Sequence, residues 1–118
     1  MFVACLRAMI DEKEFRTRSE QALISLQRAL ERASDRHDFE VDSNAGALLI
    51  EFEDPPAKFV VSPNAPVRQI WVSARVQSFK LDWSDAMNGF VLSDGRTLHQ
   101  LIAEVVSEQL GEQVALVE

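Results

Sequence analysis

The hydrophobic positions near the start of the chain recur with the period of a helix. No Gly or Pro interrupts the stretch from Asp11 to Ala33. Spacings of three and four place apolar residues on one side of a helix. The apolar stripe consists of Phe15, Ala22, Leu23, Leu26, Leu30 and Ala33. The pattern predicts a long amphipathic helix that ends around residues 34–37.

After this helix the hydrophobic residues recur at every second position, which is typical of half-buried strands. The expected strands span residues 38–42, 47–53, 58–62, 69–74, 77–83 and 90–92. The connections between them are short and contain Gly, Pro, Asn or Ser, and short connections favour antiparallel neighbours. The pattern predicts a meander of about six antiparallel strands.

A second amphipathic helix is predicted after the last strand. Thr97 and Gln100 have the spacing of a capping box, and Gly111 is a plausible stop. The apolar stripe of this helix is Leu98, Leu101, Ile102, Val105 and Val106. One face of an antiparallel sheet can bury both stripes. The sequence therefore predicts an α+β fold, an α-β sandwich with two terminal helices packed on one face of a roughly six-stranded antiparallel sheet.

The fourth expected strand has a large aromatic residue among its polar positions. If Ile70 and Val72 face the core, Trp71 and Gln69 point to the face that no helix covers. An exposed indole often anchors a partner protein, but a strand tryptophan can also be partly buried packing. Both interpretations remain open on the pattern alone. Trp83, at the end of the next strand, is expected in the core.

Composition narrows the classes of partner. The 118 residues are 47% hydrophobic and 26% charged, as in one ordinary globular domain. The net charge is −7 and the pI is about 4.8, which argues against nucleic acid and favours a basic protein or a metal cation. A single cysteine, Cys5, excludes an internal disulfide and a zinc ribbon.

The first ten residues are apolar but differ from the patterned sequence that follows. They are too short to span a bilayer and lack the pattern of a secretory signal. We expect residues 1–10 to be a poorly packed extension and residues 11–118 to form the single domain, with no membrane association. The sequence shows no Arg- and Ser-rich import leader, which favours a bacterial cytoplasm over a mitochondrion.

Carboxylates gather where the first helix meets the first strand, and folding should align them along one edge. They are Glu31, Asp35, Asp38, Glu40 and Asp42. Carboxylate oxygens without thiolates suit hard cations such as iron, manganese, calcium or magnesium. The E-x-x-H pairs of a carboxylate di-iron bundle do not occur, so any site should be weak and exposed.

A solvated charged face is the alternative interpretation of these acids. Arg28, Arg32 and Arg36 are spaced so that they could form ion pairs with Glu31 and Asp35. No nucleophilic constellation or phosphate loop is visible, and no catalytic residue is expected. The only histidines are His37, in the turn after the first helix, and His99, which is expected on the surface of the second helix.

Several segments together resemble the frataxin family, including its bacterial CyaY branch. They are the first helix, the acidic strand, and the stretches Q-I-W-V-S, F-K-L-D-W and D-G-R-T-L-H-Q-L-I. The resemblance covers about Glu12 to Leu110. It implies the same α-β sandwich and an iron-binding accessory protein of iron–sulfur cluster assembly.

The resemblance also implies site residues and partners. It implies weak binding of ferrous or ferric iron on a ridge containing Glu31, Asp35, Asp38, Glu40 and Asp42, with Asp11, Glu12 and Glu14 as weaker candidates. It implies docking on a cysteine desulfurase and an iron–sulfur scaffold protein. The docking residues would be Arg68, Gln69, Trp71 and Lys80. We expect a monomer without iron and oligomers that depend on iron.

The chain departs from the family pattern near the end of the first helix. Gln27, Arg28 and Arg32 occupy part of a stretch that is often denser in acids in the family, and fewer uncompensated carboxylates attract a cation more weakly. Two functions other than iron donor or regulator are therefore considered. One is a ferroxidase that oxidises ferrous iron at the ridge, and the other is an interaction module without a metal role.

Overall fold

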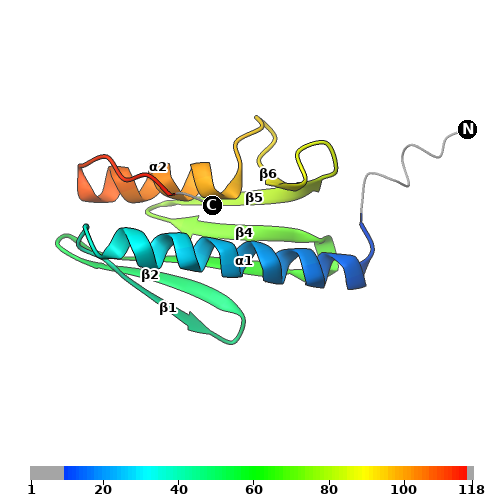
Figure 1. Cartoon of the computed structure of the whole chain (residues 1–118), viewed down its shortest axis with the longest axis horizontal. Helices are drawn as coiled ribbons and strands as arrows, with labels where there is room; N and C mark the ends of the chain where they lie inside the picture. Colours follow the sequence, from blue (N-terminus) through cyan, green and yellow to red (C-terminus); the bar gives the residue numbers. More distant parts are fainter. Residues whose placement is uncertain (1–9, 117–118) are drawn as a thin grey trace, which may run out of the picture.

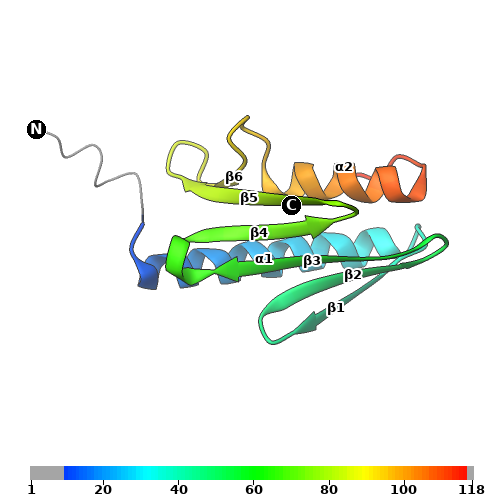
Figure 2. The same cartoon turned by 180° about the vertical axis from the view of Figure 1, so that it is seen from behind.

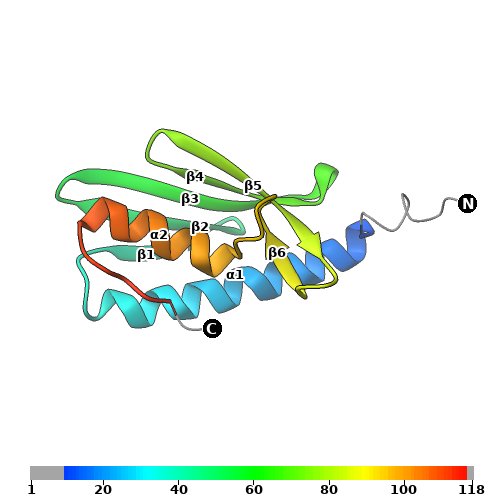
Figure 3. The same cartoon turned by 90° about the horizontal axis from the view of Figure 1, so that it is seen from above.

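The computed structural model describes residues 10–116, which form two layers. The elements in chain order are α1 (Glu12–Ser34), β1 (Glu40–Asn44), β2 (Ala47–Glu53), β3 (Pro56–Asn64), the 3-10 turn η2 (Ala65–Val67), β4 (Gln69–Ala74), β5 (Gln77–Ser84), β6 (Gly89–Val91) and α2 (Leu98–Leu110). The six strands form one antiparallel sheet in sequence order. Both helices lie on one face of this sheet (Figures 1 and 3). The predicted sandwich is confirmed.

The two faces of the sheet differ in what covers them. Figure 1 looks onto the helices, and Figure 2 looks from behind onto the face that neither helix covers. The core lies between the helices and the sheet, where Phe15, Leu26 and Leu30 of α1 are fully buried against strand residues such as Ile50 and Ile70. Each such side chain contributes about 1.5–3 kcal/mol through burial. The uncovered sheet face is therefore free to carry polar and partner-binding side chains.

The first helix begins and ends close to where its pattern predicts. Asp11 is the N-cap, and its carboxylate accepts a 2.7 Å hydrogen bond from the backbone N–H of Glu14. This bond satisfies one of the free N–H groups of the first turn, and the acidic first turn suits the helix dipole. Asp35 is the C-cap and keeps a right-handed helical conformation, so it still shares a side of the helix with Glu31.

The strands follow the predicted alternation with small shifts at their ends. β1 begins at Glu40 rather than at residue 38, β3 extends over Pro56–Asn64, and the last strand spans Gly89–Val91. The β1–β2 turn is a tight two-residue turn in which Ala45 and Gly46 have positive φ values of 54° and 87°.

The D-G-R-T segment forms the entry to α2. Asp94 accepts a 3.0 Å hydrogen bond from the backbone N–H of Arg96, and Gly95 supplies a φ of 94°. Thr97 and Gln100 then form the predicted capping box. The Arg96 backbone N–H is the main reason that the pKa of Asp94 is lowered, and the Arg96 side chain lowers it further.

Most of the expected N-terminal extension, residues 1–10, lies outside the residues that the structure describes. Residues 1–9 are not among the described residues. Ile10 is described, and it is half-buried against the core. Between residues 10 and 116, no helix is long and apolar enough to cross a membrane.

Candidate functional site

The five predicted carboxylates lie along one border of the molecule, which we call the acidic edge: Glu31, Asp35, Asp38, Glu40 and Asp42. All five are exposed, and β1 is the border strand of the sheet. Two of them accept local hydrogen bonds. Glu31 accepts one from the side chain of Gln27 at 3.3 Å, and Asp42 accepts one from the backbone N–H of Ser43 at 2.8 Å. Exposed carboxylates of this kind keep lone pairs available for a cation.

Two acids that the sequence analysis did not select belong beside this edge. Glu51 lies directly opposite Glu40 in the β1–β2 register. Together with Asp38 and Glu53 they line a shallow hollow of about 310 Å³. Glu40 and Glu51 repel each other, and Lys58, whose Nζ atom lies 4.0 Å from the Glu51 carboxylate, offsets part of that repulsion. The alternation of A-L-L-I-E-F-E already placed Glu51 and Glu53 on the outward face, but only the hairpin register shows that Glu51 lies opposite Glu40.

The weaker candidates at the start of α1 do not join the acidic edge. Asp11 caps the helix, Glu12 forms an ion pair with Arg16, and Glu14 forms one with Arg18. Glu12 precedes Glu31 by 19 residues, which corresponds to about 29 Å along the helix axis. These three acids stabilise the first turns of the helix.

Arg28 and Arg36 do not form the ion pairs with the acidic edge that their spacing allowed. Within residues 10–116, neither Glu31 nor Asp35 forms an ion pair with Arg28 or Arg36. Glu31 and Asp35 follow Arg28 by three and seven residues and lie on the same side of α1, but Glu31 accepts its hydrogen bond from Gln27 instead. Neither carboxylate is therefore held in an ion pair by these two arginines.

The acids of the described chain do not form a closed metal cage. From Ile10 to Leu116, no group of three His, Cys, Asp or Glu side chains is placed to hold a metal ion. His37 instead contacts Glu112 through its Nδ1 atom. A cation on the acidic edge would therefore have one or two carboxylates and water as ligands, an arrangement that binds weakly and exchanges readily.

The second candidate surface surrounds Trp71 on the uncovered sheet face. Its side chain is 38% exposed, which confirms the predicted outward orientation. The indole Nε1–H donates a 2.9 Å hydrogen bond to the side-chain oxygen of Gln69, and the Nζ atom of Lys80 lies 5.0 Å from the ring centroid. A hollow of about 240 Å³ beside the ring is lined by Val60 and Phe79, among others. This surface combines an aromatic anchor with a small apolar recess.

The predicted docking residues separate into two groups. Gln69, Trp71 and Lys80 are brought together, and Asp82 joins them because its carboxylate accepts a 3.1 Å hydrogen bond from Gln69. Asp82 was not selected from the sequence, although the alternation of F-K-L-D-W places it on the same face as Lys80. Arg68 does not join the group.

Arg68 holds the η2 turn together. It has a left-handed φ of 52°, and its Nη1 atom donates hydrogen bonds to the carbonyls of Ala65 and Pro66 at 3.3 and 3.1 Å. Its Nε atom is buried without a hydrogen-bond partner among the described residues. The guanidinium of Arg68 thus stabilises its own turn and does not take part in the surface around Trp71.

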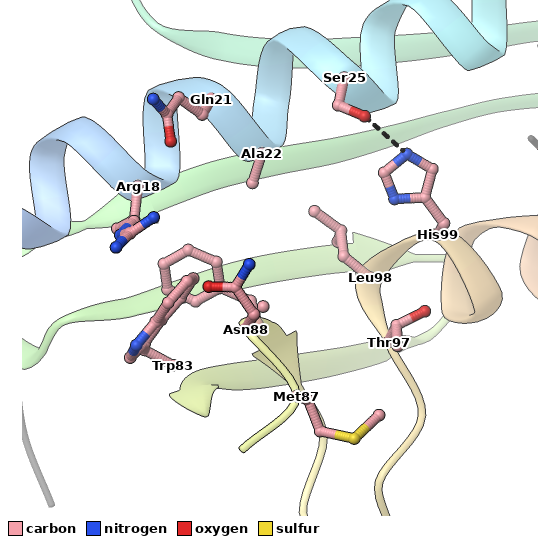
Figure 4. Close-up of a pocket in the computed structure, with 12 residues that line it drawn as sticks. Arg18, Gln21, Ala22, Ser25, Trp83, Met87, Asn88, Thr97, Leu98 and His99 are labelled. Atoms are coloured by element: carbon pink, nitrogen blue, oxygen red, sulfur yellow. Dashed lines mark hydrogen bonds between the residues drawn. The ribbon is translucent and has the colours of Figure 1, made fainter. Parts of the chain in front are cut away.

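A pocket of about 230 Å³ lies between α1, the β5–β6 hairpin and the start of α2 (Figure 4). The guanidinium of Arg18 lies 4.9 Å from the centroid of the Trp83 ring on one wall. Trp83, which was expected in the core, is partly buried and packs against the core from the pocket side. On the opposite wall, Ser25 Oγ and His99 Nε2 are 3.3 Å apart. None of the twelve residues that line the pocket is an Asp or Glu that could orient His99 as a general base.

The expected surface position of His99 is wrong. His99 is only 8% exposed, because the first turn of α2 packs against α1 and places the imidazole beside Ser25. Its sequence position next to the apolar stripe was compatible with either side of that stripe. The orientation of α2 against α1 decides which side is buried.

Comparison with known proteins agrees with this geometry. A family model described as a frataxin-like domain matches residues 8–112. The chain belongs to the frataxin-like family. This confirms the resemblance that the sequence segments showed.

Frataxin-like relatives cover nearly the whole chain. The protein named iron-sulfur cluster assembly protein CyaY of Dechloromonas aromatica is 34% identical over 107 residues, covering 91% of this chain and 99% of the relative. The protein of the same name from Azotobacter vinelandii is 31% identical over 100 residues, covering 82% and 90%. The solved structure of a frataxin from Psychromonas ingrahamii matches with a TM-score of 0.79 at 19% identity, covering 92% of this chain and 100% of that one. At that identity the structural match supports the fold alone.

Proposed function

We propose that this chain is an iron-binding accessory protein of iron–sulfur cluster assembly, acting as an iron donor or as a regulator of a cysteine desulfurase–scaffold complex. The names of the relatives and the family support the pathway. The observation that supports the finer proposal is the acidic edge, whose five carboxylates are exposed and, among the described residues, form no ion pair with Arg28 or Arg36. The relatives described above are bacterial, and we place the function in a bacterial cytoplasm.

Iron is the cargo in this proposal. Carboxylates of the acidic edge, joined by Glu51 and Glu53, would supply one or two oxygen ligands while water completes the coordination shell. Few ligands and full exposure to solvent give weak binding and fast release. A donor needs both properties, and neither requires a catalytic residue.

Partner docking would use both candidate surfaces. The acidic edge suits a basic surface of the desulfurase, and such exposed charge contacts weaken as salt rises. Trp71, held by Gln69 and Lys80, would seat on the scaffold protein. Because the same carboxylates would serve iron and the desulfurase, the two ligands should compete.

An amide NMR titration of the iron-free chain tests this proposal. One series adds ferrous iron without oxygen, and the other adds the cysteine desulfurase. Shifts or broadening from Glu31 to Asp42 in both series support a shared edge, and adding the enzyme should reduce the effect of iron. If only the enzyme perturbs these signals, the chain is a regulator without an iron site. If neither does, the proposed function is wrong.

A further inference from the structure

The pocket between α1, the β5–β6 hairpin and the start of α2 has no part in the function proposed above (Figure 4). All three of these elements contribute to its apolar lining, which consists of Ala22, Trp83, Met87, Phe90 and Leu98. Side chains that can form hydrogen bonds complete the lining: Arg18, Gln21, Ser25, Asn88, Thr97 and His99. Small-molecule sites are typically concave, mostly apolar and equipped with a few polar groups that orient the ligand. The pocket has this composition.

Arg18 carries the only permanent charge among the residues that line the pocket. Its closest contact with Glu14 is 3.5 Å between Nε and a carboxylate oxygen, which is longer than a usual hydrogen bond. Within the described residues its guanidinium forms no hydrogen bond, although it lies over the Trp83 ring. The guanidinium therefore keeps paired N–H donors that match the two oxygens of a carboxylate.

Two amide side chains beside Arg18 are also available as hydrogen-bond donors. In the part of the chain that the structure describes, neither the Gln21 nor the Asn88 side chain forms a hydrogen bond. One comes from α1 and the other from the turn between β5 and β6, and both lie with Arg18 in the left half of Figure 4. These amides can donate hydrogen bonds to an anion that the guanidinium holds.

We propose that this pocket binds a small carboxylic acid that carries one apolar, ring-sized group. A cavity of about 150 Å³ accommodates one benzene ring. The pocket, at about 230 Å³, has room for a ring and its carboxylate. The ring would rest against Ala22, Phe90 and Leu98, and the carboxylate would contact Arg18. Burial of the ring supplies affinity, and the guanidinium selects the charge.

The same lining argues against two other classes of ligand. An α-amino acid carries an ammonium group, and none of the twelve lining residues is an Asp or Glu that could pair with it. A phosphate ester brings up to two negative charges, whereas the pocket supplies one guanidinium in a chain of net charge −7. A monocarboxylate without an amine therefore fits best.

The pocket is separate from both surfaces of the proposed function. It lies beside β6 at one border of the sheet, whereas the acidic edge includes β1 at the opposite border. Trp71 lies on the sheet face that neither helix covers, and the pocket lies on the helical side (Figures 1 and 2). A ligand in the pocket would leave the acidic edge and Trp71 accessible, and this inference does not depend on the proposed function.

An NMR titration of the full chain with phenylacetate tests the inference, because the two tryptophans of the chain report on different places. Trp83 lines the pocket, and Trp71 lies on the uncovered sheet face. At constant pH and ionic strength, we expect phenylacetate to shift the indole N–H signal of Trp83 and the amide signals of residues 18–25, 87–90 and 97–99. The Kd should be on the order of 1 mM for so small a ligand. The indole signal of Trp71 should not move.

Three comparisons test the two parts of the ligand. Phenylacetamide has the same size without the charge and should bind about threefold to tenfold more weakly than phenylacetate. Acetate lacks the ring and should also bind more weakly. The variant Arg18→Gln should bind phenylacetate about threefold to tenfold more weakly and phenylacetamide as the parent does. Arg16→Gln, two residues earlier on α1 and outside the pocket, is the matched control and should bind phenylacetate as the parent does.

Several results would overturn the inference. Equal binding of phenylacetate and phenylacetamide would show that the pocket does not select a carboxylate, and equal binding of acetate would show that it does not use the ring. An equal loss in Arg16→Gln would show that only net charge matters. A shift of the Trp71 signal without one at Trp83 would place the ligand in the recess beside Trp71. The absence of any shift at Trp83 would exclude the pocket as a site for this class of ligand.

Discussion

Lys80 lies directly opposite Trp71 across β4 and β5, and its Nζ atom is 5.0 Å from the centroid of the indole ring. The ring is held a second time by Gln69, which accepts its Nε1–H. A cation over the indole face and a hydrogen bond at its edge restrict the ring to one orientation. An aromatic side chain held in place before docking loses little conformational entropy on binding.

Replacing Trp71 should therefore impair docking more than folding. We expect Trp71→Ala to abolish most of the effect of the chain on desulfurase activity in the presence of the scaffold protein. The free energy of unfolding should fall by less than about 2 kcal/mol, because the ring is not a core side chain. Enzyme assays and urea unfolding measure the two effects. Val76→Ala, a change at a fully exposed apolar residue, should alter neither, and global unfolding of Trp71→Ala would contradict the assigned role.

The hollow between β1 and β2 should contribute to cation binding. We expect the double variant Glu40→Gln with Glu51→Gln to bind ferrous iron about threefold to tenfold more weakly, since two opposed carboxylates are lost. The same change should leave the free energy of unfolding nearly unchanged, because it removes both the Glu40–Glu51 repulsion and the exposed Glu51–Lys58 ion pair. Anaerobic iron titrations and urea unfolding check both. Glu108→Gln on α2 is the control, and an equal loss of affinity there would show that only net charge matters.

Oxygen consumption separates a carrier from a ferroxidase. The carboxylates of the acidic edge are exposed, and no three-ligand group is placed to hold iron anywhere from Ile10 to Leu116. We expect oxygen uptake with ferrous iron to equal the iron-only background. Uptake above that background that disappears in Asp38→Asn with Glu40→Gln would instead establish oxidation at the edge.

The turn before α2 should make the free energy of unfolding decrease as the pH falls into the acid range. The backbone N–H and side chain of Arg96 lower the pKa of Asp94 below its ordinary value of 3.8. Its stabilising contribution is then fully present above that ordinary pKa and is lost as pH falls through the lowered folded-state pKa. Asp94→Asn should be less stable than the parent at neutral pH, and the difference should shrink in acid. Urea unfolding at several pH values measures it, and a constant difference would argue against an ionised Asp94.

Local sequence patterns predicted the helices and strands and many of the side chains that point to solvent. The helix expected from Asp11 to Ala33 is observed at Glu12–Ser34, and the capping box of Thr97 is present. The alternation around Ile70 and Val72 likewise placed Trp71 on the uncovered face. These features depend on neighbours within a few residues, and the printed sequence contains those neighbours.

Contacts between distant segments were beyond the reach of these patterns. Glu51 meets Glu40 only through the β1–β2 register, and His99 is buried only because α2 packs on α1 beside Ser25. Arg28 and Glu31 are close enough in sequence to pair, but in the structure Glu31 accepts a hydrogen bond from Gln27. The sequence by itself thus determined which residues form helices and strands and which of them alternate outward, because periodicity is local. Tertiary structure decided which charges meet, because packing and register join residues that the sequence keeps apart.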